Sequence, residues 1–243
     1  MAVYRLDIAY DGTGFRGYAR QEGLRTVQGE LEAALRTILK TEVDTAVAGR
    51  TDAGVHALGQ VVSFEYEGEI DLERLPRSLN GIVGPEISVL ASSKAPDGFN
   101  ARFSARWRRY RYSMDTSVAP NPLTRHTVWH VGRPLDVGSM AEAAAGFVGE
   151  HDFSSFCRSV EGASNVRRVT VASVEAEDGM IHVWVQANAF CHQMVRSMVG
   201  YLYDLGRGFT STPVEEVIAA RDRGMVATVA PPHGLILWAV GYD

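Results

Sequence analysis

Apolar and polar residues alternate along the first part of the chain in a pattern that predicts strands around one helix. Residues 3–10 follow the period of two of a half-buried strand, and the glycine-containing turn after them ends the run. Thr26 can cap the helix, because apolar residues recur three or four positions apart from there to Ile38. Two further strands are expected at residues 43–48 and 58–66. One face of the second is expected to carry Leu58, Val62, Phe64 and Tyr66.

The middle of the chain breaks this pattern, and the second part takes it up again. Residues 75–99 contain three prolines, which remove backbone donors and fix the local backbone, so connections and short elements are expected there. The elements expected later are a strand at residues 107–114, a short helix at 140–148, hairpin strands at 166–174 and 180–188 around Asp178-Gly179, a helix at 190–205 and a last strand at 235–240.

Strand, helix, strand, strand therefore occurs twice, and this order predicts an α+β fold of two similar halves. We expect residues 1–100 and 101–243 to form these halves, each a mainly antiparallel sheet with helices on one face. A chain of 243 residues is long enough for one large core or two smaller ones. No apolar run is long enough to span a bilayer, and five charged residues among the first twenty exclude a signal peptide. A cytoplasmic protein is expected.

The charge balance changes this picture only when its distribution is considered. A net charge of −5 argues by itself against nucleic acid, but phosphates are bound by local patches rather than by the sum. Nearly all the positive charge is arginine, since Lys40 and Lys94 are the only lysines. The planar guanidinium suits phosphate and also stacks on bases. A compositional bias of the source would explain the same preference without any function.

The two cysteines, Cys157 and Cys191, are too few for a disulfide framework and lie far apart in the sequence. Neither has a neighbour at the spacing of a structural zinc site, so no metal is expected. Buried free thiols are the favoured interpretation.

The first segment with possible chemistry is Gly49-Arg50-Thr51-Asp52-Ala53-Gly54-Val55-His56, between two expected strands. A carboxylate in such a loop can be pushed into an open site, because the flanking glycines let the backbone bend sharply and approach a substrate. The structural alternative is a turn in which Asp52 bonds its own backbone, and spacing alone favours that alternative.

The second segment, residues 99–112, interleaves five arginines with aromatic residues. Alternation along the expected strand places Arg108, Tyr110 and Tyr112 on one face and the neighbouring arginines on the other. Arginine binds phosphates, and tyrosine can stack on an exposed base for roughly 1–3 kcal/mol. A half-buried strand with one charged face is the alternative, but the density of arginine favours nucleic acid.

The third segment is the expected helix at residues 190–205. Its apolar stripe is Met194, Val195, Met198, Val199 and Leu202. His192, Arg196 and Gly200 follow one another at intervals of four on a separate face, and Gly200 would leave space for the Arg196 guanidinium to reach across a cleft. Taken alone, an amphipathic helix with a solvated edge explains this pattern equally well.

Together these segments resemble the tRNA pseudouridine synthase A family, in family order and over nearly the whole chain. The run from Gly49 to His56 is highly specific to that family. The other matching segments are Tyr10-Asp11-Gly12-Thr13-Gly14-Phe15-Arg16-Gly17-Tyr18, Val27-Gln28-Gly29, Ala101-Arg102-Phe103-Ser104-Ala105, Tyr110-Arg111-Tyr112, Asp152-Phe153-Ser154-Ser155-Phe156, and Asn188-Ala189-Phe190 through Met194-Val195-Arg196 to Gly200. The chain departs from the pattern at Asn100, where a histidine is usual, and this affects only a peripheral contact.

The resemblance implies an enzyme that converts uridine to pseudouridine at positions 38 to 40 in the anticodon stem-loop of tRNA. It also implies two halves around a central cleft, a homodimer, and no cofactor. Asp52 aligns with the catalytic aspartate, Tyr110 with a substrate-contacting tyrosine, and Arg50 with an arginine that helps displace the target base. Arg196 aligns with a basic residue expected to pair with that aspartate. The RNA backbone is expected to meet Arg102, Arg106 and Arg108.

The implied chemistry is consistent with these residues. The reaction breaks the bond from C1′ to N1 of uracil, turns the base and joins C5 to C1′, so no group leaves and none is oxidised. The sequence contains no P-loop, dinucleotide fingerprint or metal cluster. Two rivals explain less: a non-catalytic RNA-binding protein leaves Asp52 idle, and a hydrolase needs a second acid or base and releases uracil.

Overall fold

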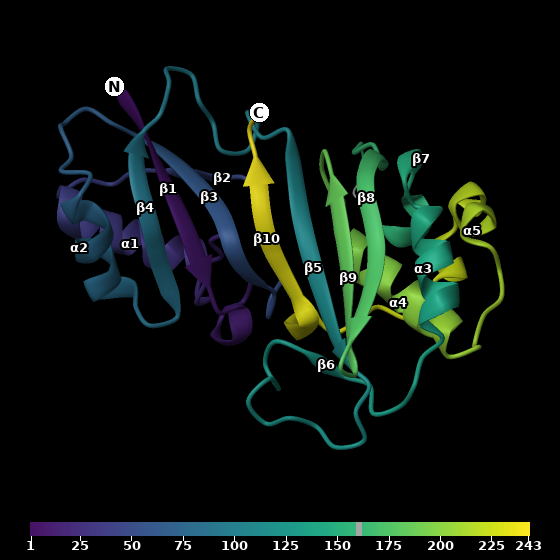
Figure 1. The fold of residues 1–243 in the computed structure, drawn as a ribbon. Helices are drawn as coiled ribbons and strands as arrows, with labels where there is room; N and C mark the ends of the chain where they lie inside the picture. The colour runs from purple at the N-terminus through teal and green to yellow at the C-terminus, as the bar shows by residue number, and fades with distance from the viewer. Residues whose placement is uncertain (159–161) are drawn as a thin grey trace. The chain divides into compact units, whose positions relative to one another are not determined.

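The strands and helices of the computed structural model fall into two units, and the strands within each unit are mainly antiparallel (Figure 1). One unit comprises Met1–Arg106 with Leu237–Asp243, and the other comprises Trp107–Ile236. The structure describes residues 1–158 and 162–243. In that part of the chain, no helix is both long enough and apolar enough to cross a membrane. The expected α+β class is confirmed, whereas the division at residue 100 and the cleft stay predictions.

The first unit arranges its strands in the order β4-β1-β3-β10, with β2 paired to β3. Its elements are β1 (Ala2–Tyr10), η1 (Gly12–Gly14), α1 (Val27–Leu39), β2 (Thr45–Val47), β3 (His56–Tyr66), α2 (Arg74–Val83), β4 (Ile87–Lys94) and most of β10 (Leu235–Gly241). Alternate residues of β1 are buried, while Arg5 and Asp7 form an ion pair at 2.8 Å on the other face. Burial of one face only is what a sheet covered by helices on one side requires.

The expected face of β3 is wrong at one position. Val62 and Phe64 are buried as expected, but Leu58 is 48% exposed. The pairing of β1 with β3 shifts register between Ile8 and Tyr10, which is opposite this end of β3. A bulge of this kind turns the following side chains to the other face, so an alternation carried through from residue 58 fails.

Both helices of the first unit have local causes in the sequence. Thr26 caps α1 as expected, and its hydroxyl accepts the Gly29 N–H at 3.2 Å. Helix α2 was not expected, because Pro76 suggested a break. Pro76 lies in the first turn, where helix N–H groups have no partner within the helix, so its missing donor costs little there. Leu75, Leu79 and Val83 form the buried stripe of α2.

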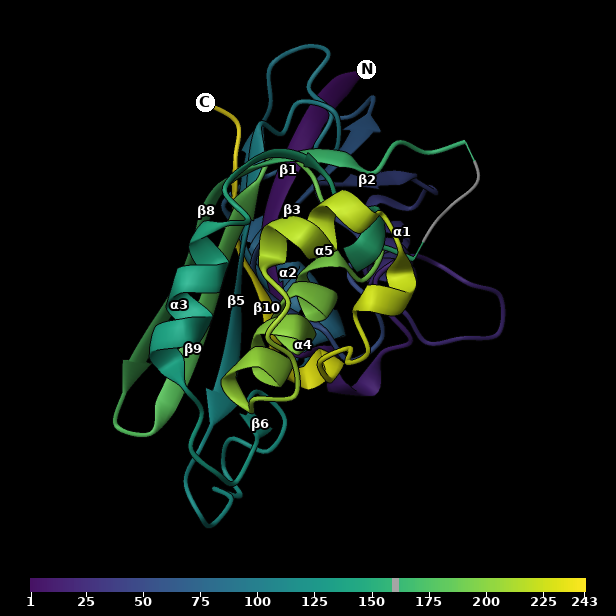
Figure 2. The same cartoon turned by 90° about the vertical axis from the view of Figure 1, so that its right-hand side faces the viewer.

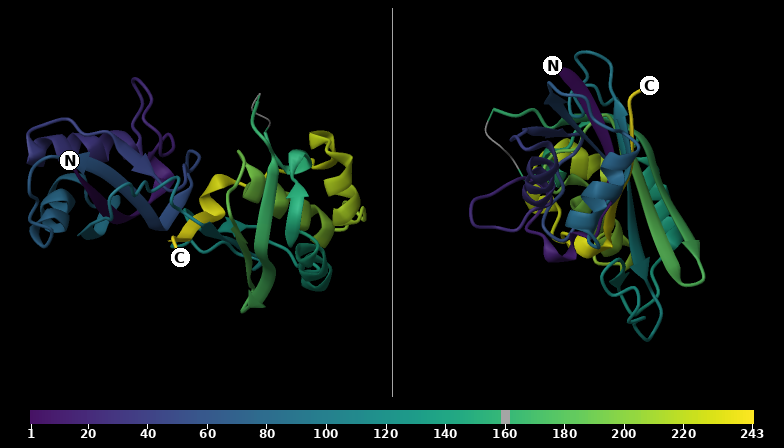
Figure 3. Two further views of the ribbon diagram at one scale, coloured as in Figure 1. Left: turned by 90° about the horizontal axis from the view of Figure 1, so that it is seen from above. Right: turned by 90° about the vertical axis from the view of Figure 1, so that its left-hand side faces the viewer.

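The second unit arranges its strands in the order β5-β9-β8-β7, with β6 parallel to β5. Figure 2 shows β5, β6, β8 and β9 from the side. Its elements are β5 (Trp107–Asp115), β6 (Trp129–His130), α3 (Val137–Ala145), β7 (Gly149–Asp152), η2 (Ser154–Phe156), β8 (Val166–Glu177), β9 (Met180–Ala187), α4 (Met194–Gly206), α5 (Val214–Ala220), η3 (Arg223–Met225) and η4 (Pro232–Gly234). Figure 3 shows the hairpin of β8 and β9 from two further directions. Asp178 and Gly179 join its strands with φ values of 48° and 79°, as a two-residue hairpin turn requires.

Helix α4 begins four residues later than expected. Gln193 has a φ of 65°, a left-handed conformation that an α-helix cannot include. A separate turn therefore precedes the helix, closed by the bond from the Met194 N–H to the Cys191 carbonyl at 3.1 Å. His192 therefore does not share a helix face with Arg196, and that expectation is wrong. The expected apolar stripe is confirmed, because all five of its members are buried.

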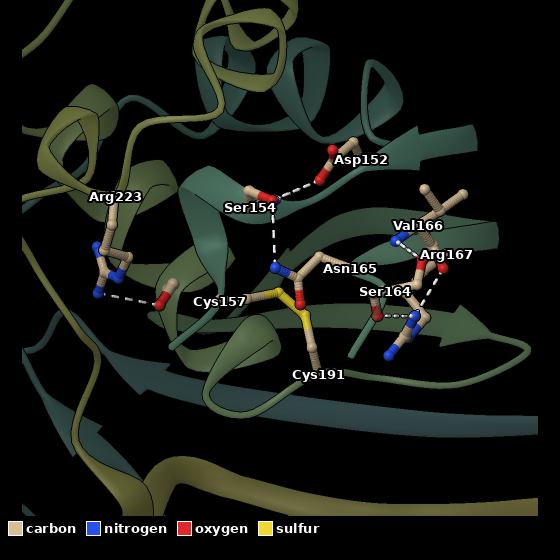
Figure 4. Close-up of a disulfide and its surroundings, with 10 residues drawn as sticks. Asp152, Ser154, Cys157, Ser164, Asn165, Val166, Arg167, Cys191 and Arg223 are labelled. Carbon is tan, nitrogen blue, oxygen red and sulfur yellow. Dashed lines mark hydrogen bonds between the residues drawn. A yellow bond between two sulfur atoms is a disulfide. The ribbon is translucent and has the colours of Figure 1, made fainter. Parts of the chain in front are cut away.

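The two cysteines are not free thiols, and the sequence-based expectation is wrong here. Cys157 and Cys191 form a disulfide across 34 residues of chain, with their Cα atoms 5.7 Å apart (Figure 4). The bond joins the end of η2 to the turn before α4, and the Arg158 N–H donates to the His192 carbonyl at 3.0 Å beside it. A pairing of this kind depends on which distant segments the fold brings together, which spacing alone does not reveal.

Candidate active site

Asp52 lies in a loop, residues 49–55, that begins where β2 stops pairing with β3 and ends where β3 begins. The last main-chain bond before the loop runs from the Ala48 N–H to the Val61 carbonyl at 2.9 Å. Beyond it Arg50 is exposed, Thr51 is buried and Asp52 is half-buried. We call residues 49–55 the Asp52 loop. The alternation places Arg50 and Asp52 toward solvent while Thr51 anchors the chain between them.

A main-chain hydrogen bond closes the turn that carries Asp52. The Val55 N–H donates to the Asp52 carbonyl at 3.1 Å, and Gly54 has a φ of 77°. A positive φ at the third residue of a four-residue turn is typical of a type II turn and favours glycine. The Asp52 carboxylate is therefore not needed to close this turn, in contrast to the turn that spacing alone favoured.

Thr51 is held through both its side chain and its main chain. Its carbonyl accepts the Tyr18 N–H at 3.0 Å, and its hydroxyl bonds the Tyr10 hydroxyl at 2.7 Å. Burial raises the pKa of Tyr10 to about 12, so its phenol stays protonated at neutral pH. The residue directly before Asp52 is thus tied to the end of β1 and to the segment that follows it.

Two glycines allow that segment to lie directly against the Asp52 loop. A Cβ on Gly12 would come within 2.1 Å of the Val55 carbonyl oxygen. Gly17 has a φ of 96°, and a Cβ there would lie 3.1 Å from the Thr51 carbonyl oxygen and 3.5 Å from the Asp52 carbonyl carbon. The motif from Tyr10 to Tyr18 is therefore a backbone support for the Asp52 loop, a role that the sequence reading did not assign.

His56 belongs to the same support. Its Nδ1 lies 3.0 Å from the Gly12 nitrogen and 3.1 Å from a carboxylate oxygen of Asp11. A backbone N–H can only donate, so Nδ1 accepts and has no hydrogen left to donate to Asp11. We therefore assign Nδ1 of His56 as an acceptor that holds Gly12, rather than as one half of an ion pair. The Asp11 oxygen accepts from Thr13 instead, at 2.9 Å from its nitrogen and 2.6 Å from its hydroxyl.

In the second unit, β5 has the alternation expected of it. Arg108 and Tyr110 are 8% and 7% exposed, whereas Arg109 and Arg111 lie on the half-buried face. Arg108 donates to the Asn188 carbonyl at 2.7 Å, and the Tyr110 ring meets Phe190 edge-on at 5.1 Å between centroids. The strand is thereby joined to the Asn188-Ala189-Phe190 segment, which the resemblance also singled out.

Arg196, in the first turn of α4, is held by a neighbouring loop. Its Nε donates to the Ala230 carbonyl at 2.8 Å, and the Ala230 N–H returns a bond to the Arg196 carbonyl at 3.0 Å. The Tyr112 hydroxyl donates to the next carbonyl, that of Pro231, at 2.9 Å. Burial raises the pKa of Tyr112, and the charge of Arg196 opposes that rise.

Gly200 has a different role from the one expected. A Cβ there would come within 2.0 Å of the Thr228 carbonyl oxygen, so the loop backbone fills the space beside the glycine. The suggestion that this space lets Arg196 reach across a cleft is therefore wrong. Gly200 lets the loop lie close to α4, and the same loop then carries the carbonyl that receives Arg196.

The remaining arginines expected at RNA differ in exposure. Arg102 and Arg106 are exposed in the first unit, whereas Arg108 is buried in the second. Arg102 lies in a turn capped by Asn100, whose side-chain oxygen accepts the N–H groups of Arg102 and Phe103 at 3.0 and 3.2 Å. Asparagine at this departure from the family pattern therefore has a local structural function.

The motif at residues 152–156 packs beneath α4. Phe153 and Phe156 are fully buried, and Phe156 meets the Tyr201 ring edge-on at 6.1 Å. Asp152 accepts from the Ser154 hydroxyl at 2.6 Å, as Figure 4 shows. These contacts place the motif in the core of the second unit.

The Asp52 loop thus brings Asp52 and Arg50 together in one unit, and the second unit brings Tyr110 and Arg108 against residues 188–190. The sequence did not indicate the roles of Tyr10 and Gln60, whose side chains bond Thr51 and Gly49 of the loop. Gln60 is a lone amide among apolar strand residues, and a buried polar group of this kind signals a required partner.

Comparison with known proteins places the chain in a family. The sequence profile described as tRNA pseudouridine synthase matches residues 8–104 and 143–243. The chain is 47% identical to the tRNA pseudouridine synthase A of Streptomyces avermitilis, over 98% of this chain and 87% of that protein. It is 46% identical to the protein of the same name from Frankia casuarinae, over 98% and 88% of the two chains. The corresponding protein of Bacillus velezensis is 42% identical over 97% of each. The chain therefore belongs to the tRNA pseudouridine synthase family of isomerases.

Proposed function

We propose that this chain converts uridine to pseudouridine at positions 38 to 40 in the anticodon stem-loop of tRNA, with Asp52 as the essential carboxylate. The supporting observation is the Asp52 loop, whose backbone is anchored on buried groups while Asp52 itself stays half-buried. A carboxylate needed only for packing would not require such a support. Relatives that carry the name tRNA pseudouridine synthase A cover nearly the whole chain.

Asp52 supplies the group that the isomerisation needs. A carboxylate can attack C1′ covalently, as it does in retaining glycosidases, or attack the uracil ring, or remove a sugar proton. All three routes keep uracil bound, so a second acid is not needed to expel it into water. Arg196 is proposed to pair with Asp52, and that pairing stays a prediction.

The target uridine must leave its stack before Asp52 can reach it. Arg50 is exposed two residues before Asp52 and is proposed to fill the gap that the base leaves. Tyr110 is proposed to hold the extruded base, which would reach the small part of its side chain that remains exposed. Arg102, Arg106 and Arg108 are proposed to contact phosphates, which positions RNA without reading its sequence.

The proposal also covers the assembly, the need for a cofactor and the location in the cell. The enzyme works as a homodimer in the cytoplasm, without a cofactor. The homodimer and the lack of a cofactor rest on the resemblance, and the location rests on the expectation drawn from the sequence.

The deciding experiment incubates the purified chain with anticodon-arm transcripts and maps pseudouridine by position. Conversion at positions 38 to 40 supports the proposal. Transcript that is bound and recovered unmodified would favour a non-catalytic RNA-binding protein. Release of free uracil would favour a hydrolase, and either result would overturn the proposed reaction.

A further inference from the structure

Gln60 is fully buried in β3, and its side-chain amide is hydrogen-bonded to Gly49 and to Tyr10. An amide without partners costs about 1–3 kcal/mol when it is buried in a protein, so its position needs a compensating network. Its Nε2 donates to the Gly49 carbonyl at 2.7 Å, and its Oε1 accepts the Gly49 N–H at 3.3 Å. The side chain thus takes the place of a strand partner for the first residue of the Asp52 loop.

The second hydrogen of the same amide leads to Tyr10. Nε2 of Gln60 lies 3.3 Å from the Tyr10 hydroxyl oxygen, and an amide nitrogen can only donate, so that oxygen accepts. The Tyr10 hydroxyl also bonds the Thr51 hydroxyl at 2.7 Å, and either oxygen can be the donor in that bond. The bonds therefore form one continuous network from Gln60 through Tyr10 to Thr51.

These contacts fix the chain on both sides of Arg50. Gly49 is held by Gln60, and Thr51 is held by Tyr10 and by the Tyr18 N–H. Arg50 and Asp52, which alternate with these anchored residues, project from a backbone that has little freedom to move. We define the clamp as the side chains of Gln60 and Tyr10.

We propose that the clamp positions Arg50 and Asp52 for the isomerisation, so that Gln60 and Tyr10 are positioning residues of this enzyme. The inference rests on the proposed function, with Asp52 as the reacting carboxylate. A displacement of about 1 Å in a reacting group can cost on the order of 100-fold in rate. Loss of the clamp should therefore reduce the chemical step much more than it reduces RNA binding, because Arg102, Arg106 and Arg108 are proposed to contact phosphates from outside the loop.

The sharpest test removes one hydroxyl. Tyr10→Phe keeps the ring that packs 6.2 Å from Tyr18 but deletes both clamp bonds of the phenol. Tyr4→Phe is the matched control, because Tyr4 lies in the same strand, is 4% exposed against 5% for Tyr10, and bonds the Gly68 carbonyl at 2.9 Å, away from the loop. We expect Tyr10→Phe to lower the single-turnover rate at least tenfold with the Kd for RNA within threefold. Tyr4→Phe should stay within twofold in both.

A second pair of variants tests the amide. Gln60→Met removes the bridge to Gly49, and Asn80→Leu removes a bridge of the same type to Val89, with bonds of 2.7 and 3.0 Å, far from the loop in the chain. Both changes should lower Tm, but only Gln60→Met should also lower the single-turnover rate of the folded protein. If Gln60→Met does not fold, the tyrosine pair decides the question alone.

A double-mutant cycle separates the clamp from general packing. Thr51→Val removes the other end of the 2.7 Å bond, so its effect on rate and that of Tyr10→Phe should overlap rather than multiply. Asp52→Asn is measured alongside. If Asp52→Asn is inactive while Tyr10→Phe equals Tyr4→Phe, the clamp inference alone is overturned. If Asp52→Asn retains activity, the proposed site fails and the clamp inference fails with it.

Discussion

At the scale of single residues, the Asp52 loop separates residues that hold the backbone from residues that face solvent. Thr51 is 7% exposed and bonded through both its hydroxyl and its carbonyl, while Arg50 on its other side is exposed. Asp52 follows this anchored residue, so its backbone is fixed while its side chain stays only half-buried. That arrangement limits the entropy lost when a substrate is aligned with it.

Asp52→Asn should abolish turnover and leave both fold and RNA affinity nearly unchanged. Asparagine has the same shape, and the bond that closes the turn uses the Asp52 main-chain carbonyl, so the loop should persist. Pseudouridine formation, Tm and RNA Kd should be measured on the same preparation. Turnover above the level of the uncatalysed control would remove Asp52 from its proposed role.

Tyr110 should respond differently to the loss of its hydroxyl and to the loss of its ring. Tyr110→Phe keeps the edge contact with Phe190 and should keep most RNA affinity while turnover slows. Tyr110→Ala removes a ring that is 7% exposed and should cost about 3–5 kcal/mol in stability through the cavity it leaves. Tm and single-turnover rate on both variants separate the roles. Full activity of Tyr110→Phe combined with unfolding of Tyr110→Ala would make this tyrosine purely structural.

Arg196→Met should reduce the rate of turnover more than it reduces RNA binding. The change removes the charge proposed to serve Asp52, and it also removes the 2.8 Å bond to Ala230. Arg223 provides a matched control in the same unit, because it also bonds a loop carbonyl, that of Val226. Arg223→Met should lower Tm similarly without the specific loss of rate. Equal effects of the two variants on rate would show that Arg196 acts only through the loop.

Residue roles that depend on local chain order were predictable, and those that depend on distant contacts were not. Thr26 was expected to cap a helix and does, because a cap is decided within four residues. Gly200 was assigned wrongly, since the Thr228 backbone that fills its space comes from elsewhere in the chain. The support that Gln60 gives to Gly49 spans eleven residues and a strand pairing, which no local pattern contains.

At the scale of elements, regular patterns predicted most strands and helices, but β4, β6, β7, α2 and α5 were not expected. Strand β5 and the hairpin of β8 and β9 are close to their expected bounds because both alternate clearly. Helix α2 was missed because Pro76 lies in its first turn, and α4 begins late because Gln193 is left-handed. In both cases the position of one residue within the element, rather than its type, decides the outcome.

Two elements of the second unit are joined by the disulfide between Cys157 and Cys191, and its removal should be measurable. Closing a loop of 34 residues should stabilise the fold by about 3–4 kcal/mol on a chain-entropy estimate. Protein purified without reductant should lose on the order of 10 °C in Tm when it is reduced. The double variant Cys157→Ser and Cys191→Ser should show no further change on reduction. Two titratable thiols in unreduced, unfolded wild-type protein would contradict the bond.

At the scale of the whole molecule, the total charge and the proposed substrate point in opposite directions. The chain carries a net charge of −5, yet tRNA is a polyanion. Several acidic residues are paired with arginines other than those proposed at RNA, for example Glu86 with Arg25 at 2.6 Å and Glu150 with Arg168 at 2.9 Å. The hydrogen bond from Arg25 lowers the pKa of Glu86, and this keeps the Glu86 carboxylate ionised. We therefore expect the distribution of charge, rather than its sum, to decide RNA binding, and the sequence alone indicated this only through its clustered arginines.

RNA affinity should fall steeply with salt despite the acidic total. If Arg102, Arg106 and Arg108 each neutralise one phosphate, the released counterions should lower affinity by about 20- to 40-fold between 50 and 200 mM salt. Arg102→Gln should reduce the slope of log K against log salt by about one. Arg36→Gln is the control, since Arg36 is an exposed arginine on α1 paired with Glu42 at 3.2 Å, and it should leave the slope unchanged. Arg108 is 8% exposed, so Arg108→Gln tests whether a buried guanidinium shares in this contact. An RNA affinity that is nearly constant across the salt series would show that phosphate contacts are not the main source of binding.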